Sequence, residues 1–139
     1  MAQNTQDIRW KQRLGNFSKA LAQLTLFYEK ANSLNHLEEL GLIKAFEYNY
    51  ELAWNCIKDF YESQGETGIQ GSRDAIQMAF KRELIVNGES WMQMLQDRNR
   101  TAHSYNEETA NEIVAHIISI YYQLFIALRN ELQRIAELN

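Results

Sequence analysis

The complete absence of proline constrains this chain more than any other feature of its sequence. Across 139 residues there is no proline, and there are only six glycines. Because proline ends or kinks a helix, a compact chain without it favours long helices with few interruptions. Apolar residues make up 45% of the chain, which is enough for a hydrophobic core, and the length fits one domain spanning residues 1–139.

Apolar residues recur along the chain at alternating steps of three and four, the spacing of the buried face of an amphipathic helix. Candidate N-caps precede three of these patterns, at Asp7, Ser72 and Asn106. The sequence predicts all-α structure, as an antiparallel up-and-down four-helix bundle with one additional short helix. The expected helices cover about residues 7–31, residues 37–63, a short segment from Ser72, a segment from Glu89, and the chain after Asn106. Ile120 belongs to the apolar stripe expected for the last of these helices.

The charge balance excludes one class of function. The formal net charge of −4 argues against a protein that coats nucleic acid by bulk charge, because such domains are strongly basic. Two interpretations stay open for the basic residues that lie close in sequence, a local anion site or a solvated surface of mixed charge. These basic residues are Arg73, Lys81, Arg82, Arg98 and Arg100.

Other residue types point away from redox, metal and membrane chemistry. The single cysteine, Cys56, falls in an apolar helical pattern, which favours a small buried side chain over a reactive thiol. Cysteine, histidine and carboxylate residues show no metal-ligand spacing, so we expect no metal and no cofactor. Residues 1–6 are polar and no apolar run approaches a span of about 20 residues. We therefore expect a cytoplasmic protein with no membrane partner.

One eight-residue segment gathers side chains suited to chemistry on phosphate esters. An arginine binds phosphate through a planar fork of donors, and a histidine transfers a proton near neutral pH. A tyrosine adds a hydroxyl that can itself accept a group. The segment reads Arg98-Asn99-Arg100-Thr101-Ala102-His103-Ser104-Tyr105.

The position of Arg98 allows two interpretations. It lies on the same predicted apolar stripe as Trp91 and Tyr105, and a charge on an apolar seam is unfavourable unless it is paired. Arg98 therefore either pairs with a carboxylate of another helix, for example Glu47 or Glu51, or faces a pocket or a subunit interface and binds an anion.

His103 raises a geometric problem, because it follows Arg98 by five positions. In an ideal helix this spacing separates two side chains by roughly 140°, so the two share no face, whereas Asn99 and His103 do. Either the helix distorts at its end, or the groups converge around a cleft or across two copies of the chain. We expect the other histidines, His36 and His116, to be structural or exposed.

The spacing of Arg98, His103 and Tyr105 resembles the Arg-x4-His-x-Tyr signature of HEPN-domain proteins encoded beside a minimal nucleotidyltransferase. Three further stretches look like the subfamily called nucleotidyltransferase substrate-binding proteins, so that the resemblance covers nearly the whole chain. These stretches are residues 7–13, Phe46-Glu47-Tyr48 to Glu51-Leu52-Ala53-Trp54, and Gly71-Ser72-Arg73-Asp74.

The resemblance implies a helical homodimer whose two motifs face each other across the dimer cleft, with a small nucleotidyltransferase as partner. In toxin–antitoxin versions, the HEPN protein is a metal-independent endoribonuclease, and the partner silences it by transferring AMP to the tyrosine of the motif. Carried over to this chain, Arg98 and His103 would be catalytic and Tyr105 would be the acceptor. Asn99 and Arg100 would support them, with Arg100 positioning the RNA backbone.

Three functions therefore stay open at the level of the sequence. The chain is a ribonuclease toxin with RNA as substrate, or a non-catalytic substrate-binding or regulatory subunit of the nucleotidyltransferase, or a purely structural helical dimer. The first two overlap, because one protein can be both toxin and modification target.

Overall fold

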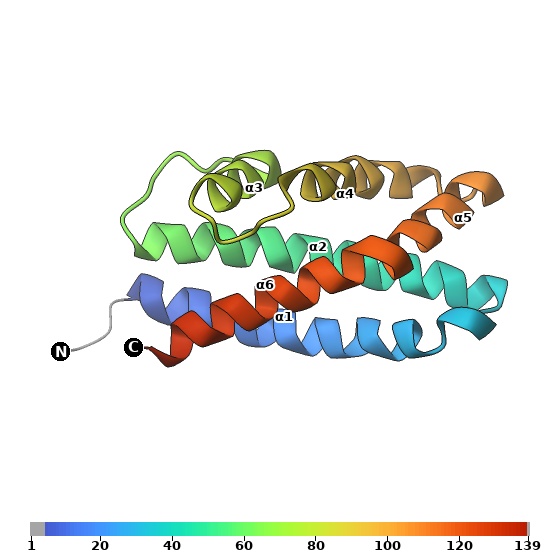
Figure 1. Cartoon of the computed structure of the whole chain (residues 1–139), viewed down its shortest axis with the longest axis horizontal. Helices are drawn as coiled ribbons and strands as arrows, with labels where there is room; N and C mark the ends of the chain where they lie inside the picture. The colour runs from blue at the N-terminus through green and yellow to red at the C-terminus, as the bar shows by residue number, and fades with distance from the viewer. Residues whose placement is uncertain (1–4, 139) are drawn as a thin grey trace.

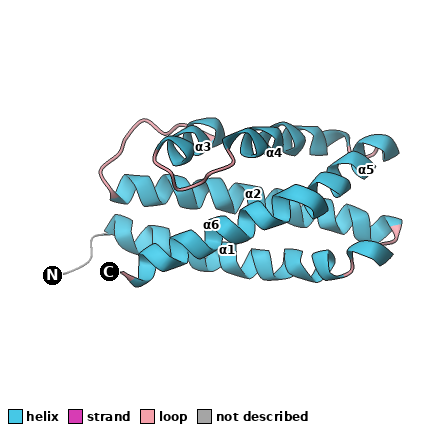
Figure 2. Ribbon diagram, viewed as in Figure 1, coloured by secondary structure: helices cyan, strands magenta, loops and turns pink. Residues whose placement is uncertain are grey.

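A computed structural model of the chain describes residues 5–138, and every regular element in this part is helical, which confirms the predicted all-α fold (Figure 1, Figure 2). The elements in chain order are α1 (Thr5–Glu29), the 3₁₀ turn η1 (Ala31–Ser33), α2 (His36–Ser63), α3 (Ser72–Lys81), α4 (Gly88–Arg100), the 3₁₀ turn η2 (Thr101–His103), α5 (Glu107–His116), the π-helical turn η3 (Ile117–Tyr121) and α6 (Tyr122–Glu137).

The two longest helices, α1 and α2, form an antiparallel pair along the length of the molecule (Figure 1). The start of α2 is fixed by a capping box, in which the Glu38 N–H donates to Asn35 Oδ1 at 2.8 Å and the Asn35 N–H donates to Glu38 Oε1 at 3.0 Å. Glycine at position 41 keeps the pair close, because a Cβ there would lie 3.0 Å from the ring of Phe27. The predicted helix over residues 37–63 is thus confirmed to within one residue.

The other helices cover this pair and complete the bundle. α6 lies against α1, while α3 and α4 follow one another along α2 (Figure 1). Phe125 on α6 lies where four helices meet, since its ring contacts Phe17 of α1, Phe46 of α2 and Trp91 of α4 at centroid distances of 6.1, 6.1 and 5.9 Å. All four rings are buried. The predicted four-helix bundle with an additional short helix, α3, is confirmed.

Two of the predicted N-caps are wrong. α1 begins at Thr5, so Asp7 lies inside the first turn, where it accepts a hydrogen bond from the Trp10 indole N–H at 2.9 Å. Ser72 is the first residue of α3 and Gly71 is its N-cap. A carboxylate inside the first turn stabilises the positive end of a helix without occupying the cap position, as Asp7 does in α1 and Asp74 in α3.

Two sequence predictions for the helical run from α5 to α6 are corrected by the structure. Residues 107–137 are long and apolar enough to cross a membrane, with a mean hydropathy of 1.3 in the most apolar window. By this criterion of length and composition, the expectation that no apolar run approaches the length of a membrane span is wrong. The apolar side chains that produce this value include Ile113 and Leu128, which are buried in the bundle core. The π turn η3 also displaces the predicted stripe, because Tyr121 is fully buried where Ile120 was expected.

Candidate functional site

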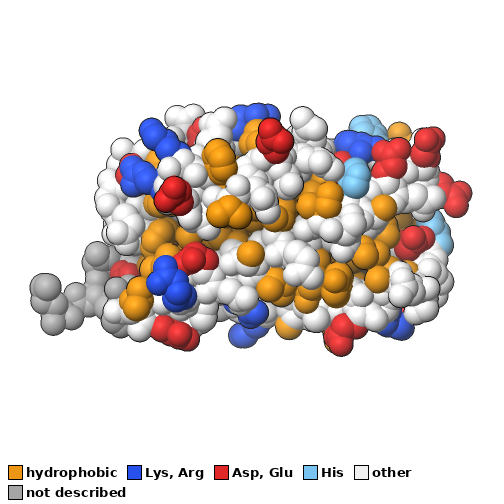
Figure 3. Space-filling model, in the orientation of Figure 1, with side chains coloured by type: hydrophobic (Ala, Val, Ile, Leu, Met, Phe, Trp, Pro, Cys, Tyr) orange, Lys and Arg blue, Asp and Glu red, His pale blue; other side chains and the backbone are white. Residues whose placement is uncertain are grey.

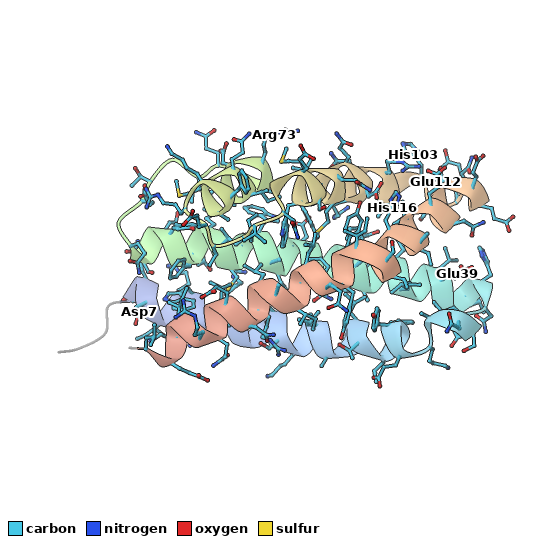
Figure 4. The ribbon with its side chains drawn as sticks, in the orientation of Figure 1. Asp7, Glu39, Arg73, His103, Glu112 and His116 are labelled. Atoms are coloured by element: carbon cyan, nitrogen blue, oxygen red, sulfur yellow. The ribbon has the colours of Figure 1, made fainter. Side chains whose placement is uncertain are left out.

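The predicted functional segment forms the tip of a helical hairpin between α4 and α5. α4 ends at Arg100 and tightens into η2, and the chain then turns into α5. The predicted cap at Asn106 is confirmed, since its side-chain oxygen accepts the Thr109 N–H at 3.1 Å. Figure 4 places His103 and Glu112 at this end of the molecule, and Figure 3 shows histidine, basic and acidic side chains gathered there.

Arg98 is held by a neighbouring helix. Its Nε–H donates to Glu51 Oε1 at 3.2 Å, and Nη1 donates to Thr101 Oγ1 at 3.1 Å. Glu51 is in turn oriented by the Trp54 indole N–H at 2.8 Å. The sequence left open whether Arg98 pairs with a carboxylate of another helix, and it does so with Glu51. The Arg98 side chain is 29% exposed, and a guanidinium has five N–H groups, so donors remain available to an anion.

His103 and Tyr105 lie side by side at the hairpin tip. The Tyr105 hydroxyl is 3.4 Å from His103 Nδ1, and the two rings meet edge to face at a centroid distance of 5.9 Å. Both side chains are exposed, and Tyr105 reaches 84% exposure. The prediction that Tyr105 continues the buried stripe of α4 is therefore wrong, because the chain leaves α-helical geometry at Thr101.

The tip does not join Arg98 and His103 directly. Within residues 5–138, no hydrogen bond links the two side chains, and the 3₁₀ turn η2 separates them. Asn99 is exposed, as is His103, but α4 ends between them. The helix therefore distorts at its end, as one of the open interpretations anticipated, without a hydrogen bond between the guanidinium and the imidazole.

The basic residues that lie close in sequence are dispersed and mostly paired with carboxylates. Arg100 donates to Asp97 Oδ1 at 3.0 Å and to Glu112 Oε2 at 2.6 Å, and the bond to Glu112 in particular raises the pKa of Arg100. Arg82 pairs with Glu66. Figure 4 places Arg73 over α3, away from the hairpin tip. These contacts favour the interpretation as a solvated surface of mixed charge over a single anion site.

A buried carboxylate that the sequence did not single out stands behind the tip. Asp97 is only 2% exposed, and its Oδ2 lies 2.6 Å from His116 Nδ1 and accepts the Tyr121 hydroxyl at 2.5 Å. Burial, and then the bond to Asp97, raise the pKa of Tyr121 above its usual range. The sequence did contain a signal for this residue. Asp97 follows the buried Met94 by three positions, and this spacing places a charge on the core face of α4.

Comparison with protein families identifies the chain. Residues 12–134 match the family described as "nucleotidyltransferase substrate binding protein like". The chain belongs to this nucleotidyltransferase substrate-binding family. The match includes all of α4, the hairpin tip and α5, so the candidate site lies within the family domain.

Two proteins from Haemophilus influenzae are similar to this family member. A probable ribonuclease HepT is 30% identical over 81 residues, which cover 55% of this chain and 56% of the relative, so the chain spans little more than half the length of that relative. The structure of HI0074, described as the fold of a substrate-binding domain of a nucleotidyltransferase, superposes with a TM-score of 0.75 at 22% identity. The superposition covers 86% of this chain and 98% of HI0074, which shows that the two proteins have the same fold.

Proposed function

We propose that this chain is the HEPN-type subunit of a cytoplasmic two-component system, in which it binds a minimal nucleotidyltransferase and presents Tyr105 as the acceptor of a nucleotidyl group. The observation that carries the proposal is the exposed Tyr105 hydroxyl 3.4 Å from His103 Nδ1. An imidazole at this position can take the phenolic proton, which turns the phenol into a nucleophile.

The transfer step balances with a nucleoside triphosphate supplied by the partner. The Tyr105 oxygen forms a bond to the α-phosphorus, the bond from that phosphorus to pyrophosphate breaks, and the phenolic proton passes to His103. The exposure of the tyrosine suits this step, because the active site of a second protein must reach its hydroxyl. The product is a phosphodiester that adds a negative charge beside the imidazole.

In its unmodified form, the same hairpin is proposed to be a metal-independent endoribonuclease. His103 takes the proton of a ribose 2′-hydroxyl or gives one to the leaving 5′ oxygen, while Arg98 stabilises charge on the phosphoryl oxygens, with Asn99 and Arg100 in support. Because Arg98 and His103 share no hydrogen bond within the described part of one chain, a homodimer that sets two hairpins face to face would complete the site. A nucleotidyl group on Tyr105 would then cover His103 and repel the RNA phosphates.

One observation favours a second candidate, a substrate-binding subunit without ribonuclease activity. Glu51 partly neutralises Arg98, and two carboxylates engage Arg100, which leaves the tip less attractive to a polyanion. In this alternative, the hairpin serves only as the docking and modification site of the nucleotidyltransferase.

Co-expression with the nucleotidyltransferase encoded beside this chain, followed by intact-mass measurement, tests the partnership and the modification together. We expect a nucleotidyl mass increase on the wild type that is lost in Tyr105→Phe. Tyr48→Phe is the matched control, because Tyr48 is also exposed but lies on α2. A mass increase that persists in Tyr105→Phe would show that the acceptor is another residue.

Expression of the chain alone tests the ribonuclease. We expect growth arrest that is relieved by His103→Ala and not by the control His36→Ala, another exposed histidine. Purified wild-type protein should also cleave RNA in the presence of a chelator of divalent metals. Intact RNA under these conditions would favour the non-catalytic subunit.

A further inference from the structure

Asp97 is the centre of a polar network that joins the two arms of the hairpin. From α4, Arg100 Nη1 donates to Asp97 Oδ1 at 3.0 Å. From the other arm, His116 Nδ1 and the Tyr121 hydroxyl meet Asp97 Oδ2 at 2.6 and 2.5 Å. Arg100 continues across the hairpin to Glu112 Oε2 at 2.6 Å. A buried carboxylate is tolerated only when such donors compensate its desolvation.

The π turn η3 makes this convergence geometrically feasible. His116 and Tyr121 are five residues apart, and in an α-helix that spacing would point their side chains roughly 140° away from each other. A π-helical turn closes i→i+5 hydrogen bonds and places such residues above one another. Their rings are accordingly 6.0 Å apart, and both reach the same oxygen of Asp97. The helix thus departs from α geometry at η3, the turn that brings both side chains to Asp97.

The position of the network relative to the tip indicates its role. Asp97 immediately precedes Arg98 in α4, and His116 and Glu112 lie on α5, the arm that follows the tip. Figure 4 shows His116 and Glu112 below His103 at this end of the molecule. The network therefore fastens both arms of the hairpin directly beneath the residues that carry the proposed chemistry.

We propose that Asp97 is a positioning residue, which through Arg100, His116 and Tyr121 holds the hairpin tip so that His103 and Tyr105 keep a fixed place relative to Arg98. The functional part of this inference rests on the proposed function, whereas the clamp itself does not.

The chemistry of the two donors supports a stable clamp. Asp97 Oδ2 accepts the Tyr121 hydroxyl and lies 2.6 Å from His116 Nδ1, so the tautomer of His116 that carries its proton on Nδ1 donates to it as well. Burial and the charge of Asp97 raise the pKa of Tyr121, so its hydroxyl stays protonated and donates. Besides these donors, the charged groups of the cluster are Arg100 and its second partner Glu112.

Two adjacent tyrosines provide a matched test. Tyr121→Phe removes only the hydroxyl that Asp97 accepts, whereas Tyr122→Phe removes a hydroxyl that bonds Thr25 Oγ1 at 2.8 Å, on the α1 side of the same helix. The readout is amide hydrogen exchange in the full chain at Ser104 and Asn106, whose N–H groups close the turns of the tip. We expect about tenfold faster exchange there in Tyr121→Phe and no change in Tyr122→Phe.

A conservative rescue separates positioning from general loss of structure. His116→Asn keeps an N–H donor near the position of Nδ1, whereas His116→Leu removes it, so we expect exchange at the tip to be slow in the first variant and fast in the second. Unchanged exchange at Ser104 and Asn106 in both Tyr121→Phe and His116→Leu would overturn the clamp, whatever the activity of the protein.

The functional readout is the rate of nucleotidyl transfer to Tyr105 by the co-purified partner. We expect Tyr121→Phe to lower kcat about tenfold with little change in the KM for the chain, because the acceptor is misplaced and the docking surface is intact. If the wild type is not modified at all, the proposed function fails, and the exchange measurement still decides on the clamp. A change confined to KM would contradict positioning.

Discussion

The seam between α1 and α2 joins an antiparallel helix pair along its length, whereas α4 and α5 form a hairpin that is joined near its tip, and the two regions are stabilised in different ways. The seam is mostly apolar, and its two buried polar side chains among the described residues are Asn49, which donates to Ala20 O of α1 at 3.1 Å, and Asp59, which accepts a hydrogen bond from Arg13 Nε at 3.0 Å. The hairpin instead encloses Asp97 with three donors from both of its arms. Apolar burial is non-directional, whereas a satisfied polar network fixes positions. The seam therefore supplies stability, and the hairpin supplies a defined geometry.

The largest expected effect lies on the buried face of α1, where the seam meets α6. Phe17→Ala removes a fully buried ring of α1 that meets Phe125 edge to face, and we expect a loss of about 3–5 kcal/mol in the free energy of unfolding. Leu26→Ala on the exposed side of the same helix should stay within about 0.5 kcal/mol of the wild type. Urea denaturation measures both. Equal effects of the two variants would contradict the assignment of apolar burial along α1 as the main source of stability.

The second prediction compares the two buried aspartates. Asp97→Asn removes the charge and places amide hydrogens against at least one of three donors. We therefore expect the free energy of unfolding to fall by about 2–3 kcal/mol. In Asp59→Asn, the amide oxygen can turn towards the single donor Arg13, so we expect the free energy of unfolding to fall by only about 1 kcal/mol.

Urea denaturation of the two variants side by side is the measurement. A larger loss for Asp59→Asn would reverse the contrast between the two helix pairs. Hydrogen exchange adds a second criterion, because the effect of Asp97→Asn should extend to the tip residues, and that of Asp59→Asn should not.

The third prediction concerns the ion pair that joins α2 to the hairpin. Glu51→Gln keeps one of the two oxygens that accept from Arg98 and Trp54, so one of these two hydrogen bonds is lost, and the Glu51 side chain is 46% exposed. We therefore expect less than about 1 kcal/mol of change in stability. A thermal melt in low and high salt checks this, with Lys44→Gln, which breaks an exposed ion pair within α2, as the control. A loss as large as that of Asp97→Asn would show that Glu51, too, belongs to the fixed geometry.

The smallest expected effect is an absence of reaction at Cys56 in the seam. Burial first, and then the nearby Asp59 charge, raise the pKa of its thiol to about 12. A raised pKa keeps the thiol protonated, so at about pH 8 the folded protein should not react with a thiol-specific reagent, while the unfolded chain should react with one equivalent. Rapid labelling of the folded protein would indicate that the seam opens locally.

The sequence predicted those parts of the fold that follow from a single helical period. The bounds of α2, the bundle architecture and the cap at Asn106 depend only on local patterns, and the structure agrees with them. The pairing of Arg98 with Glu51 was one of two open interpretations, because sequence spacing cannot decide which distant carboxylate a buried charge meets.

Besides the N-caps at Asp7 and Ser72 and the expectation that no run approaches a membrane span, two predictions failed because the helical geometry changes. Tyr105 was placed on the stripe of α4, but the chain tightens to a 3₁₀ turn at Thr101 and exposes it. Ile120 was placed on the buried face, but the π turn brings Tyr121 there instead. Neither change leaves a periodic trace in the sequence, and the network around Asp97 depends on the second of them.

The π turn limits which sequence changes the protein can accept between α5 and α6. The one extra residue in that turn offsets the face that α6 turns towards the bundle from the face that α5 turns towards the tip. Deleting a single residue between Ile117 and Tyr121 would rotate one of these faces by roughly 100° against the other. Either the core of α6 or the donors to Asp97 would then be lost, so this stretch should accept substitutions far more readily than changes in length.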